Sequence, residues 1–521
     1  MKKKIALLLA LTLLLGTFAG CGESSEEAYV PTGNALVMEG QDPDSVGPQK
    51  EEEVQELTLA YYPERGLNPL TCNDYTNRVL FSLIYQNMFN VKDDYTVEPI
   101  LCGSYKVSAN YRTWVFYVDE NATFSDGSPV TGEDVLATYQ AAKASGYYSG
   151  RFTPVHEMQL GEDGGVIFYL STAYENLPQI LDIPILKAEE VEAEAPIGSG
   201  PYMLTSTLAG AHLIRSNMWW CKDLKIIVTA PSVELVEAES PAQIRDQFEF
   251  FDVGLVCADP CSDMYADFRC DYELWDVDNG IFLYLACNTR YVDFLEDTTL
   301  RAMLTYGINR EKIVADNFNG YAQAVTLPAD PSSPYYSKSL AARYEYDPRK
   351  FVEFLGRYGK TEEPIRLLVN SDDSVRLRIA HYIADAFSDY GLPMEVIECT
   401  SNRFQNEIYN ANYDLYLGIT KLSANMDLSA FYAPYGNLSR NGVSDATLYS
   451  LCLESLANQG NYYNLHKAVA DDGRIIPIAF FGYSIYATRG LLTDLTPARD
   501  NIFAYSLGKS MQEIQIPTEY K

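Results

Sequence analysis

The stretch IRLLVNSDDSVRLRIAHYIADAFSDYGLPMEVIE, residues 365–398, constrains the fold of this chain more than any other. It begins with an apolar run, continues with apolar residues at helical spacing, reaches a glycine stop at Gly391 and ends in a second apolar run. A strand, a helix and a second strand in this order favour a parallel strand pair, because parallel neighbours must be joined by a crossover connection. The sequence therefore predicts a mixed α/β protein.

Other segments add strands and helices to this prediction. Residues 57–61 are a predicted strand, and the continuous apolar run in residues 280–290 is typical of a strand covered on both faces. Residues 300–320 predict two short helices, the second capped by Asn309 and ended by Gly320. One buried strand face is predicted at four alternating positions: Tyr413, Leu415, Leu417 and Ile419.

The stretch FSDGSPVTGEDVLATYQAA, residues 124–142, follows a predicted strand over residues 113–118. Its Asp-Gly-Ser-Pro sequence is typical of a tight turn. Thr131, followed by Glu133 and Asp134, is typical of the first residues of a helix. Asp126 and Glu133 could be taken for a catalytic carboxylate pair. A turn former and an acid in the first turn of a helix explain both, so we expect scaffold here.

The first 20 residues have the pattern of a secretory signal: three lysines, a short apolar run and small residues. Cys21 directly follows Ala-Gly, which resembles the bacterial lipobox, where that cysteine is lipidated and becomes the new N-terminus. An ordinary signal with an incidental cysteine is the alternative. Residues 22–56 hold ten acids and one base without periodicity, so we expect residues 21–55 to form a disordered acidic stalk. The mature protein is then expected outside the membrane on a lipid tether.

Charge and composition exclude some classes of function. The chain has 521 residues, 47% of them hydrophobic, which predicts a large core and two or three domains. Its formal net charge is −32, and nucleic acid is therefore not an expected partner, because phosphate binding requires a basic face.

The metal-ligating residue types do not form a metal-binding pattern. Cys257, Cys261 and Cys270 cluster, yet their spacing fits no common zinc site and no histidine completes one. The four histidines lie far apart in the sequence. We expect no metal, no cofactor and cysteines that act as small buried hydrophobic residues, with room for one disulfide.

Five short motifs occur in a fixed order along the chain. They are Leu67-Asn68-Pro69 with Leu83 to Met88, Phe124 to Val135, Gly198 to Tyr202, Asn288 with Leu300 to Ala302 and Ile308 to Val314, and Tyr346 to Lys350. Each is a weak signal alone. Together they resemble the family 5 solute-binding proteins, the peptide- and nickel-type substrate receptors of ABC importers, from about residue 55 to the C-terminus.

The resemblance implies a periplasmic-binding-protein-like class II fold, with two α/β lobes around a cleft and an extra inserted domain. It implies hinge strands near residues 278–290 and 476–486. The implied domains are a discontinuous lobe I (56–90, 196–280 and 482–521), an inserted α/β domain (91–195) and lobe II (281–481).

The resemblance also implies a function. The protein is expected to be a monomeric, lipid-anchored extracellular receptor that captures a peptide or similar small solute and delivers it to an ABC permease. A role in sensing cannot be separated from import by sequence.

Two other functions compete with this one. An oligosaccharide receptor of the same fold would use aromatic platforms, and Trp219-Trp220 is the candidate, although these residues stand where relatives have a packing turn. A lipid-anchored hydrolase would need a nucleophile or a carboxylate pair, and Gly198-Ser199-Gly200 runs into Pro201 rather than into a helix. We therefore expect no enzyme.

The resemblance also points to ligand-binding residues. Dipeptide-binding members place an Asp after the "yDl" strand against the peptide ammonium group, and an Arg after the first strand of the βαβ unit against its carboxylate. Here Lys421 and Leu422 stand near the expected Asp, and Asp427 comes later. The candidate residues are Asp427, Arg403, Arg376, Asn370 and Lys421. Both anchors look displaced, which predicts a longer peptide held by its main chain or a non-peptide solute; the alternative is that Asp427 still holds an ammonium group.

Overall fold

The computed structural model describes residues 57–207, 210–259, 261, 268–289, 292–358, 363–434, 436–438, 442–509 and 512–513. The chain divides into two compact units, residues 1–53 and 54–521, and every described residue belongs to the second. The predicted signal peptide (1–20), the lipidated Cys21 and the stalk (21–55) lie outside the described residues.

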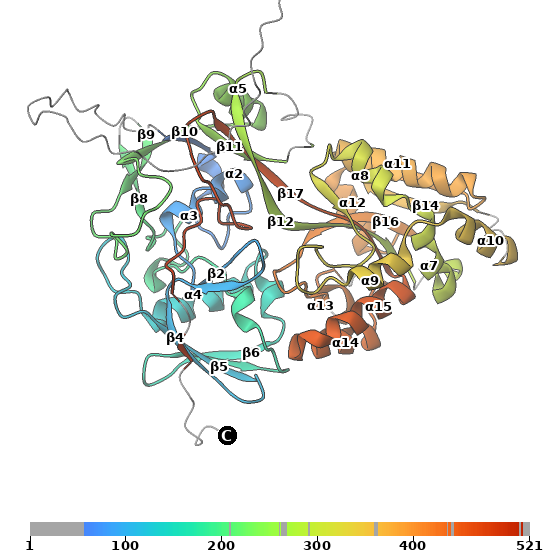
Figure 1. Cartoon of the computed structure of the whole chain (residues 1–521), viewed down its shortest axis with the longest axis horizontal. Helices are drawn as coiled ribbons and strands as arrows, with labels where there is room; N and C mark the ends of the chain where they lie inside the picture. The colour runs from blue at the N-terminus through green and yellow to red at the C-terminus, as the bar shows by residue number, and fades with distance from the viewer. Residues whose placement is uncertain are drawn as a thin grey trace, which may run out of the picture. The chain divides into compact units, whose positions relative to one another are not determined.

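The largest sheet has eleven strands among the described residues, in the order β15-β14-β16-β12-β17-β11-β1-β10-β9-β8, with β13 beside β17 (Figure 1). Its strands are β1 (Leu57–Tyr61), β8 (Tyr202–Thr207), β9 (Gly210–Arg215), β10 (Ser232–Glu237), β11 (Leu255–Ala258), β12 (Tyr272–Cys287), β13 (Ala322–Ala324), β14 (Ile365–Asn370), β15 (Met394–Cys399), β16 (Leu415–Lys421) and β17 (Ile475–Thr488). We call β1, β8, β9, β10 and β11 the N-terminal sheet half, and β14, β15 and β16 the C-terminal sheet half.

The two longest strands, β12 and β17, join these halves. They pair antiparallel from Tyr272 opposite Thr488 to Ala286 opposite Ile475, with a register shift between Val277 and Ile281 (Figure 1). One end of this pair lies beside β11, and the other end lies beside β16. A second register shift lies between Leu283 and Tyr284, so two continuous strands with two irregularities run through the residues that were expected to form the hinge.

The βαβ unit of the C-terminal sheet half is confirmed. Strand β14 pairs in parallel with β15, and α11 (Ser374–Asp389) connects them. Asp373 caps α11 by accepting the Arg376 backbone N–H at 2.9 Å. Apolar side chains at helical spacing then pack in the core, and Gly391, with a φ of 95°, ends the segment in the left-handed region that glycine tolerates.

The prediction for β16 was partly wrong. Tyr413, Leu415 and Leu417 are buried as expected, but Ile419 is 38% exposed, and Tyr416, on the opposite face, is only 4% exposed. The physical reason is that β16 lies between β12 and β14 and is covered on both faces, with the Tyr416 ring packed against Tyr284 and Tyr413. Alternation therefore does not hold in this central strand.

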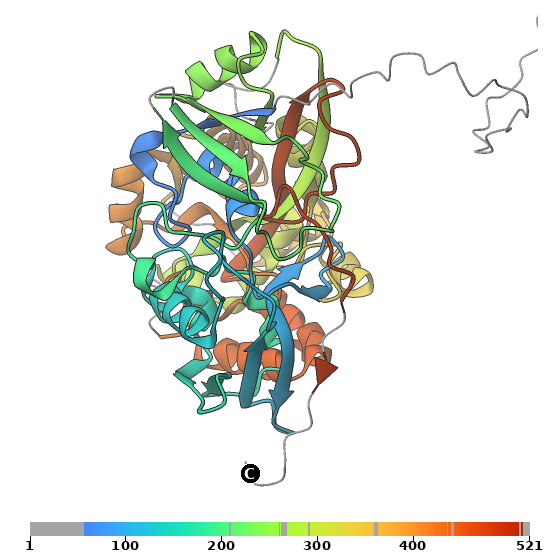
Figure 2. The ribbon, with the colours of Figure 1, turned by 90° about the vertical axis from the view of Figure 1, so that its left-hand side faces the viewer.

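Among the residues that the structure describes, a smaller sheet contains five strands in the order β18-β4-β5-β7-β6 (Figure 2). Its strands are β4 (Cys102–Val107), β5 (Thr113–Val118), β6 (Val155–Leu160), β7 (Val166–Leu170) and β18 (Gln512–Glu513), and a separate two-stranded pair is formed by β2 (Phe89–Val91) and β3 (Val97–Pro99). Strand β18 pairs in parallel with β4. The end of the chain, which was expected in lobe I, thus contributes a strand to the sheet formed by residues of the expected inserted domain.

The remaining helices surround these sheets. They are α2 (Tyr75–Arg78), α3 (Phe81–Ile84), α4 (Gly132–Ala144), α5 (Pro241–Glu249), α6 (Asp293–Glu296), α7 (Thr298–Leu304), α8 (Arg310–Asn317), α9 (Lys338–Ala341), α10 (Pro348–Tyr358), α12 (Ser401–Tyr409), α13 (Ser429–Tyr432), α14 (Ala446–Ala457) and α15 (Tyr462–Asp472). Asn309 caps α8 by accepting the Lys312 N–H at 3.0 Å, as predicted, although the helix ends at Asn317 before Gly320.

The stretch at residues 124–142 is scaffold, as predicted. Asp126 accepts the Ser128 N–H at 2.9 Å within its turn and forms an ion pair with Lys187 at 2.8 Å, which lowers the pKa of Asp126 to about 2. Thr131 and Asp134 form the capping box of α4. Glu133 is exposed in the first turn of that helix. Both carboxylates therefore belong to the turn and to the helix start.

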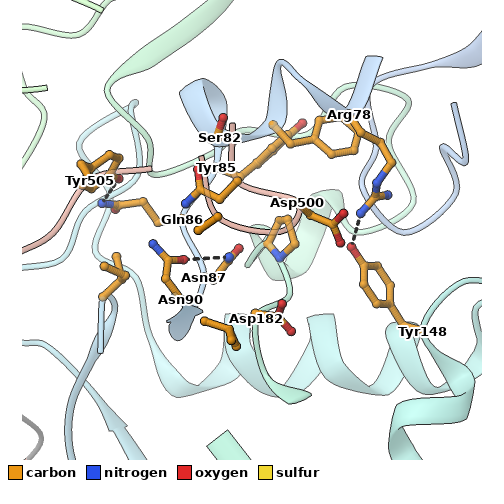
Figure 3. A pocket seen from close by; sticks show the side chains of 16 residues that line it. Arg78, Ser82, Tyr85, Gln86, Asn87, Asn90, Tyr148, Asp182, Asp500 and Tyr505 are labelled. Atoms are coloured by element: carbon orange, nitrogen blue, oxygen red, sulfur yellow. Dashed lines mark hydrogen bonds between the residues drawn. The ribbon is translucent and has the colours of Figure 1, made fainter. Parts of the chain in front are cut away.

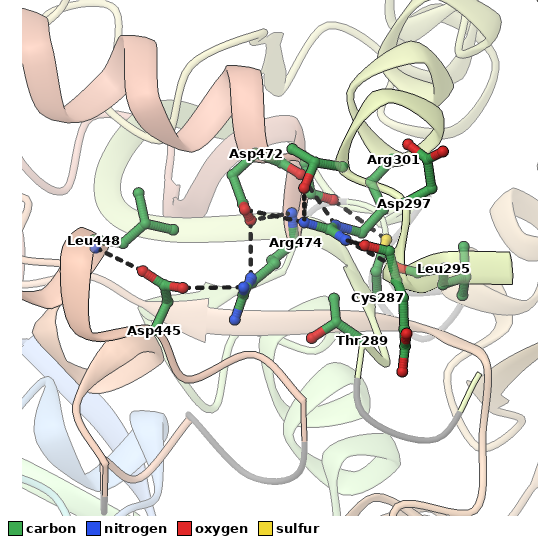
Figure 4. A network of polar contacts seen from close by, with 12 residues as sticks. Cys287, Thr289, Leu295, Asp297, Arg301, Asp445, Leu448, Asp472 and Arg474 are labelled. Carbon is green, nitrogen blue, oxygen red and sulfur yellow. Dashed lines mark hydrogen bonds and ion pairs between the residues drawn. The ribbon is translucent and has the colours of Figure 1, made fainter. Parts of the chain in front are cut away.

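A polar network ties the helices of the C-terminal sheet half together (Figure 4). Arg301, only 1% exposed, donates to the Leu295 and Glu296 carbonyls at 2.8 Å and pairs with Asp472 at 3.0 Å. Asp472 also pairs with Arg474 at 3.0 Å, and Arg474 reaches Asp445, the cap of α14, at 3.0 Å. The arginine of the Leu300 to Ala302 motif is therefore structural.

Candidate functional site

Two cavities lie where residues of the C-terminal sheet half meet the rest of the described chain. The first, which we call the Lys421 cavity, has a volume of about 330 Å³. It is lined by Gly146, Tyr147, Gly150, Arg151, Thr420, Lys421, Leu422, Ser423, Asp427, Ala430, Asn437 and Leu438. One wall thus comes from the segment between α4 and β6, and the other comes from the end of β16 and the loop and helix that follow.

The second, which we call the Asp259 cavity, has a volume of about 510 Å³. It is lined by Tyr62, Arg65, Asp74, Tyr75, Thr76, Pro241, Cys257, Ala258, Asp259, Asp372, Asp373, Ser374, Val375 and Tyr483. Residues at the carboxyl end of β11, in the N-terminal sheet half, face residues at the carboxyl end of β14, in the C-terminal sheet half. Ligands of open α/β sheets bind at such strand ends.

Lys421 is the last residue of β16, and its side chain is 24% exposed in its cavity. Its ammonium group forms an ion pair with Asp500, which lies in the segment after β17. Burial lowers the pKa of Lys421; the attraction of Asp500 opposes that shift, and the positive charges of Arg499 and Arg78 reinforce it. The ion pair therefore joins the C-terminal sheet half to the last segment of the described chain.

Asp500 and Lys421 belong to a larger set of buried charges, which we call the charge cluster: Arg78, Arg151, Asp182, Lys421, Arg499 and Asp500. Burial alone would raise the pKa of Asp500, but Lys421, Arg78 and Arg499 lower it well below its usual range. Arg151 forms an ion pair with Asp182, and these two side chains are only 12% and 10% exposed. Figure 3 shows the Asp500 carboxylate beside the Arg78 guanidinium, which donates to the Tyr148 hydroxyl at 2.7 Å.

Tyrosine rings surround the charge cluster. Tyr147 lines the Lys421 cavity, and its pKa is raised to about 12 by burial first and by Asp500 next. Tyr75 and Tyr483 line the Asp259 cavity and meet edge to face, with ring centroids 4.3 Å apart. Burial raises the pKa of the Tyr75 phenol well above its usual value, and Cys257 and Asp500 add to this rise. These phenols therefore stay neutral at physiological pH.

Asp427 lines the Lys421 cavity from the loop before α13. One of its carboxylate oxygens accepts the Ser429 N–H at 2.8 Å and the Ser429 hydroxyl at 2.7 Å. Burial raises the pKa of Asp427, while the two bonds from Ser429 oppose that rise. Among the described residues no base lies within ion-pair distance of Asp427.

Carboxylates dominate the Asp259 cavity. Asp74 pairs with Arg65, and Asp373 pairs with Arg376 at 2.6 Å. Asp259 accepts the Cys261 N–H at 2.9 Å. Burial raises the pKa of Asp259, and the negative charge of Asp373, from the opposite sheet half, adds to the rise. Two like charges thus face each other across this cavity.

The structure separates the five residues that were predicted to bind the ligand. Lys421 and Asp427 line the same cavity. Arg376 pairs with Asp373 at the rim of the other cavity. Asn370 ends β14 and donates to the Ser401 hydroxyl at 3.0 Å, and Arg403, 62% exposed, pairs with Glu407 at 3.2 Å on α12. Arg376, Asn370 and Arg403 do not line either cavity.

Sequence reasoning missed the charged surroundings of Lys421. Arg78, Arg151 and Asp500 come from three distant segments, and none stands in a recognisable motif. The one available signal was that Arg78 falls on the buried side of the segment with Val79, Leu80, Leu83 and Ile84, where an unpaired charge would be unfavourable.

In the described part of the chain no group of three or more His, Cys, Asp or Glu side chains could hold a metal ion. The nine cysteines of that part are free thiols, seven of them buried. None of its helices is both long and apolar enough to cross a bilayer.

Comparison with known sequences identifies a family. Residues 96–442 match the model for the middle region of the bacterial extracellular solute-binding proteins, family 5. The oligopeptide-binding protein AppA of Bacillus subtilis is 22% identical over 315 residues, 56% of this chain and 57% of AppA. The nickel-binding periplasmic protein of Escherichia coli is 23% identical over 329 residues, 59% of this chain and 61% of that protein. The chain thus matches less than two thirds of the length of these relatives.

Comparison with solved structures identifies the fold. The ABC transporter substrate-binding protein CtaP of Listeria monocytogenes superposes with a TM-score of 0.71 at 18% identity, over 86% of this chain and 97% of CtaP. AppA of Bacillus subtilis in complex with a nonapeptide superposes with a TM-score of 0.64 at 17% identity, over 87% and 99%. The predicted fold, that of a two-lobed periplasmic binding protein, is confirmed.

Proposed function

Because the chain belongs to the family 5 bacterial extracellular solute-binding proteins, we propose that it is the substrate-binding component of an ABC importer and captures a peptide or similar small solute between two lobes. One observation carries this proposal. The Lys421 cavity is lined by Tyr147 and Arg151 on one wall and by Thr420 to Ser423, Asp427, Ala430, Asn437 and Leu438 on the other. A solute in it would contact both walls at once, which shifts an open–closed equilibrium toward the closed form.

The hinge of that motion is the β12–β17 pair. In our proposal lobe I comprises residues 56–90, 196–280 and 482–521, the inserted domain 91–195, and lobe II 281–481. The register shift between Val277 and Ile281 falls at the boundary between the lobes. A few residues at such a point can absorb a change of backbone angles while the strands on either side stay paired.

The remaining parts of the proposal concern location and partners. Cys21 carries a lipid that holds the protein at the extracellular face of the cell membrane. Residues 21–55 are the tether, and the closed form meets a membrane permease. The receptor works as a monomer and binds its solute without turnover. Tethering raises the effective concentration of receptor at the transporter.

The solute is proposed to be a peptide or a peptide-like compound that is not read by two charged ends. Lys421, where an ammonium-binding Asp would stand in dipeptide receptors, is a base. Asp427 is the carboxylate of the same cavity. The sugar alternative finds less support, because Trp219 is only 3% exposed and the Trp220 indole N–H donates to Gln86 at 2.8 Å. Both rings of that candidate platform serve packing, as the sequence analysis favoured.

Small-angle X-ray scattering of the full chain tests this function. Casein-digest peptides should reduce the radius of gyration and raise the melting temperature, and mass spectrometry should recover the bound peptides intact. An unchanged scattering curve and melting temperature with every small-molecule fraction would contradict solute binding. Cleaved peptides would favour a hydrolase.

The lipid anchor has its own test. Radiolabelled palmitate should enter the wild-type protein and not the Cys21→Ser variant in cells. Equal labelling of both proteins would show that the anchor assignment is wrong.

A further inference from the structure

The proposed inserted domain meets the proposed lobe II at a second place, away from both cavities. The residues that meet there, which we call the 174–179 contact, are Tyr174, Glu175 and Gln179 of the inserted domain and Tyr335, Asn425 and Leu456 of lobe II. Five of these side chains are buried, and that of Glu175 is partly buried. None of the six lines the Lys421 cavity or the Asp259 cavity.

The buried amide of Gln179 is hydrogen-bonded from lobe II. The Tyr335 hydroxyl donates to Gln179 Oε1 at 2.6 Å, and Gln179 Nε2 donates to the Tyr95 carbonyl at 3.1 Å. Gln179 is 6% exposed and Tyr335 is 5% exposed, so water has little access to either group. A buried acceptor that loses its donor is unfavourable, whereas the same acceptor exposed to water is not. The bond between Tyr335 and Gln179 therefore favours the arrangement in which the two domains touch.

Two further hydrogen bonds cross the same boundary. The Asn425 side-chain amide donates to the Tyr174 hydroxyl, and the Glu175 backbone N–H donates to the Leu456 carbonyl at 3.1 Å. The Tyr462 hydroxyl, at the start of α15, donates to the Asn425 carbonyl and so holds the Asn425 loop from the lobe II side. Each polar group of this set has its partner only while inserted domain and lobe II stay together.

Apolar packing interlocks across the boundary as well. Val91 and Tyr95 of the inserted domain pack in a hydrophobic cluster whose other buried members, among the described residues, belong to lobe II. In the reverse direction, Leu456 of α14 packs in the cluster that lobe I and the inserted domain share. Separation of the two sides would return this surface to water, which is unfavourable.

The inserted domain is continuous with lobe I rather than with lobe II. Besides the shared cluster, the Leu67 N–H donates to the Glu194 carbonyl and the Ile185 N–H donates to the Gln86 carbonyl, both at 2.9 Å. Lobe I and lobe II are joined by the β12–β17 pair. A rotation about that pair moves lobe II away from lobe I and from the inserted domain together, so it must separate the 174–179 contact.

We propose that the 174–179 contact stabilises the closed form and thereby sets the affinity for the solute from outside the cavity. This inference rests on the solute-binding function proposed above and concerns the regulation of the same site. The apparent dissociation constant equals the intrinsic constant divided by the fraction of receptor that is closed. A group that favours closure therefore strengthens binding, although it does not touch the solute.

Two phenylalanine variants distinguish this role from ordinary packing. Tyr335→Phe removes the hydroxyl that donates to Gln179 across the contact. Tyr202→Phe is the matched control, because its buried hydroxyl donates to the Val228 and Ala230 carbonyls within lobe I. Both variants should lower the melting temperature. In isothermal titration with casein-digest peptides, Tyr335→Phe should raise the half-saturating concentration about tenfold, and Tyr202→Phe should leave it unchanged.

Unchanged affinity in Tyr335→Phe, or an equal loss in Tyr202→Phe, would overturn the inference while solute binding itself stands. If casein-digest peptides do not bind the wild type, the proposed function fails for peptides, and a ligand-free measurement then decides the inference. The amide of Glu175, which donates to Leu456, should exchange its hydrogen faster in Tyr335→Phe than in the wild type and in Tyr202→Phe. Equal exchange in all three proteins would show that the 174–179 contact is permanent.

Discussion

The two cavities of this protein differ in the sign of their charge. The Lys421 cavity is lined by two bases, Arg151 and Lys421, and one carboxylate, Asp427. The Asp259 cavity is lined by four carboxylates and one base, and Asp259 faces Asp373 across the space between the sheet halves. A net charge of −32 spread over the chain therefore says little about a particular cavity. Local partners decide what each cavity can hold.

The largest expected effect comes from the carboxylate that the bases share. Asp500→Asn removes the negative charge that interacts with Lys421, Arg78 and Arg499, so we expect a loss of about 3–5 kcal/mol in the free energy of unfolding. Denaturant titration measures it. Asp316→Asn, in the exposed pair with Lys312, is the matched control and should change stability little. Similar stability for both variants would mean that the cluster does not depend on Asp500.

Removal of the Lys421 charge should raise stability, whereas removal of the Asp500 charge should lower it, and the effect at Lys421 should depend on pH. Because its folded-state pKa is lowered, its charged form is disfavoured by folding, and this penalty is fully present below the folded pKa. Lys421→Met should therefore be more stable than the wild type at neutral pH, by about 1 kcal/mol. The difference should shrink as pH rises through the folded pKa toward 10.5, the usual lysine value. A difference that grows with pH would contradict this account.

The stability difference caused by Asp259→Asn should have the opposite pH dependence: it should grow as pH rises. The pKa of Asp259 is raised in the folded state, so folding disfavours the charged form of this carboxyl group. The free energy of unfolding therefore falls as pH rises through the folded pKa. Asp259→Asn should be slightly more stable than the wild type at neutral pH, by well under about 1 kcal/mol. That difference should disappear on acidification toward 3.8. Unfolding curves of both proteins across this pH range provide the measurement, and a constant difference would exclude the repulsion from Asp373.

The smallest expected effect is at Arg403, which was a candidate from sequence but lies on the exposed face of α12 in a pair with Glu407. Arg403→Ala should leave peptide affinity within about twofold of the wild type, because exposed pairs contribute little. Isothermal titration with casein-digest peptides measures it. A large loss of affinity would move the solute away from the Lys421 cavity.

Sequence alone predicted the parts of the fold that depend on local patterns. The βαβ unit, the Asn309 cap and the Asp126 turn all follow from residues close together in the chain. The face of β16 was partly wrong because neighbouring strands and covering layers, which no local pattern reveals, bury Tyr416 as well.

The candidate site was less predictable for the same reason. Lys421 and Asp427 could be proposed because they follow a strand that relatives use for binding. Their surroundings could not, since Arg78, Arg151 and Asp500 come together only in the folded chain. Arg376 shows the limit clearly: one turn into α11, it pairs with the cap Asp373 of its own helix.

Hydrogen–deuterium exchange of the full chain, with and without casein-digest peptides, tests most directly whether a solute is held between two walls. Peptide binding in the Lys421 cavity should slow exchange at residues 146–151 and 420–430 together, because these segments contribute residues to its opposite walls. Slower exchange in both segments, lost in Lys421→Met, is the predicted result. Protection of only one segment, or of neither while the peptides still bind, would contradict the account.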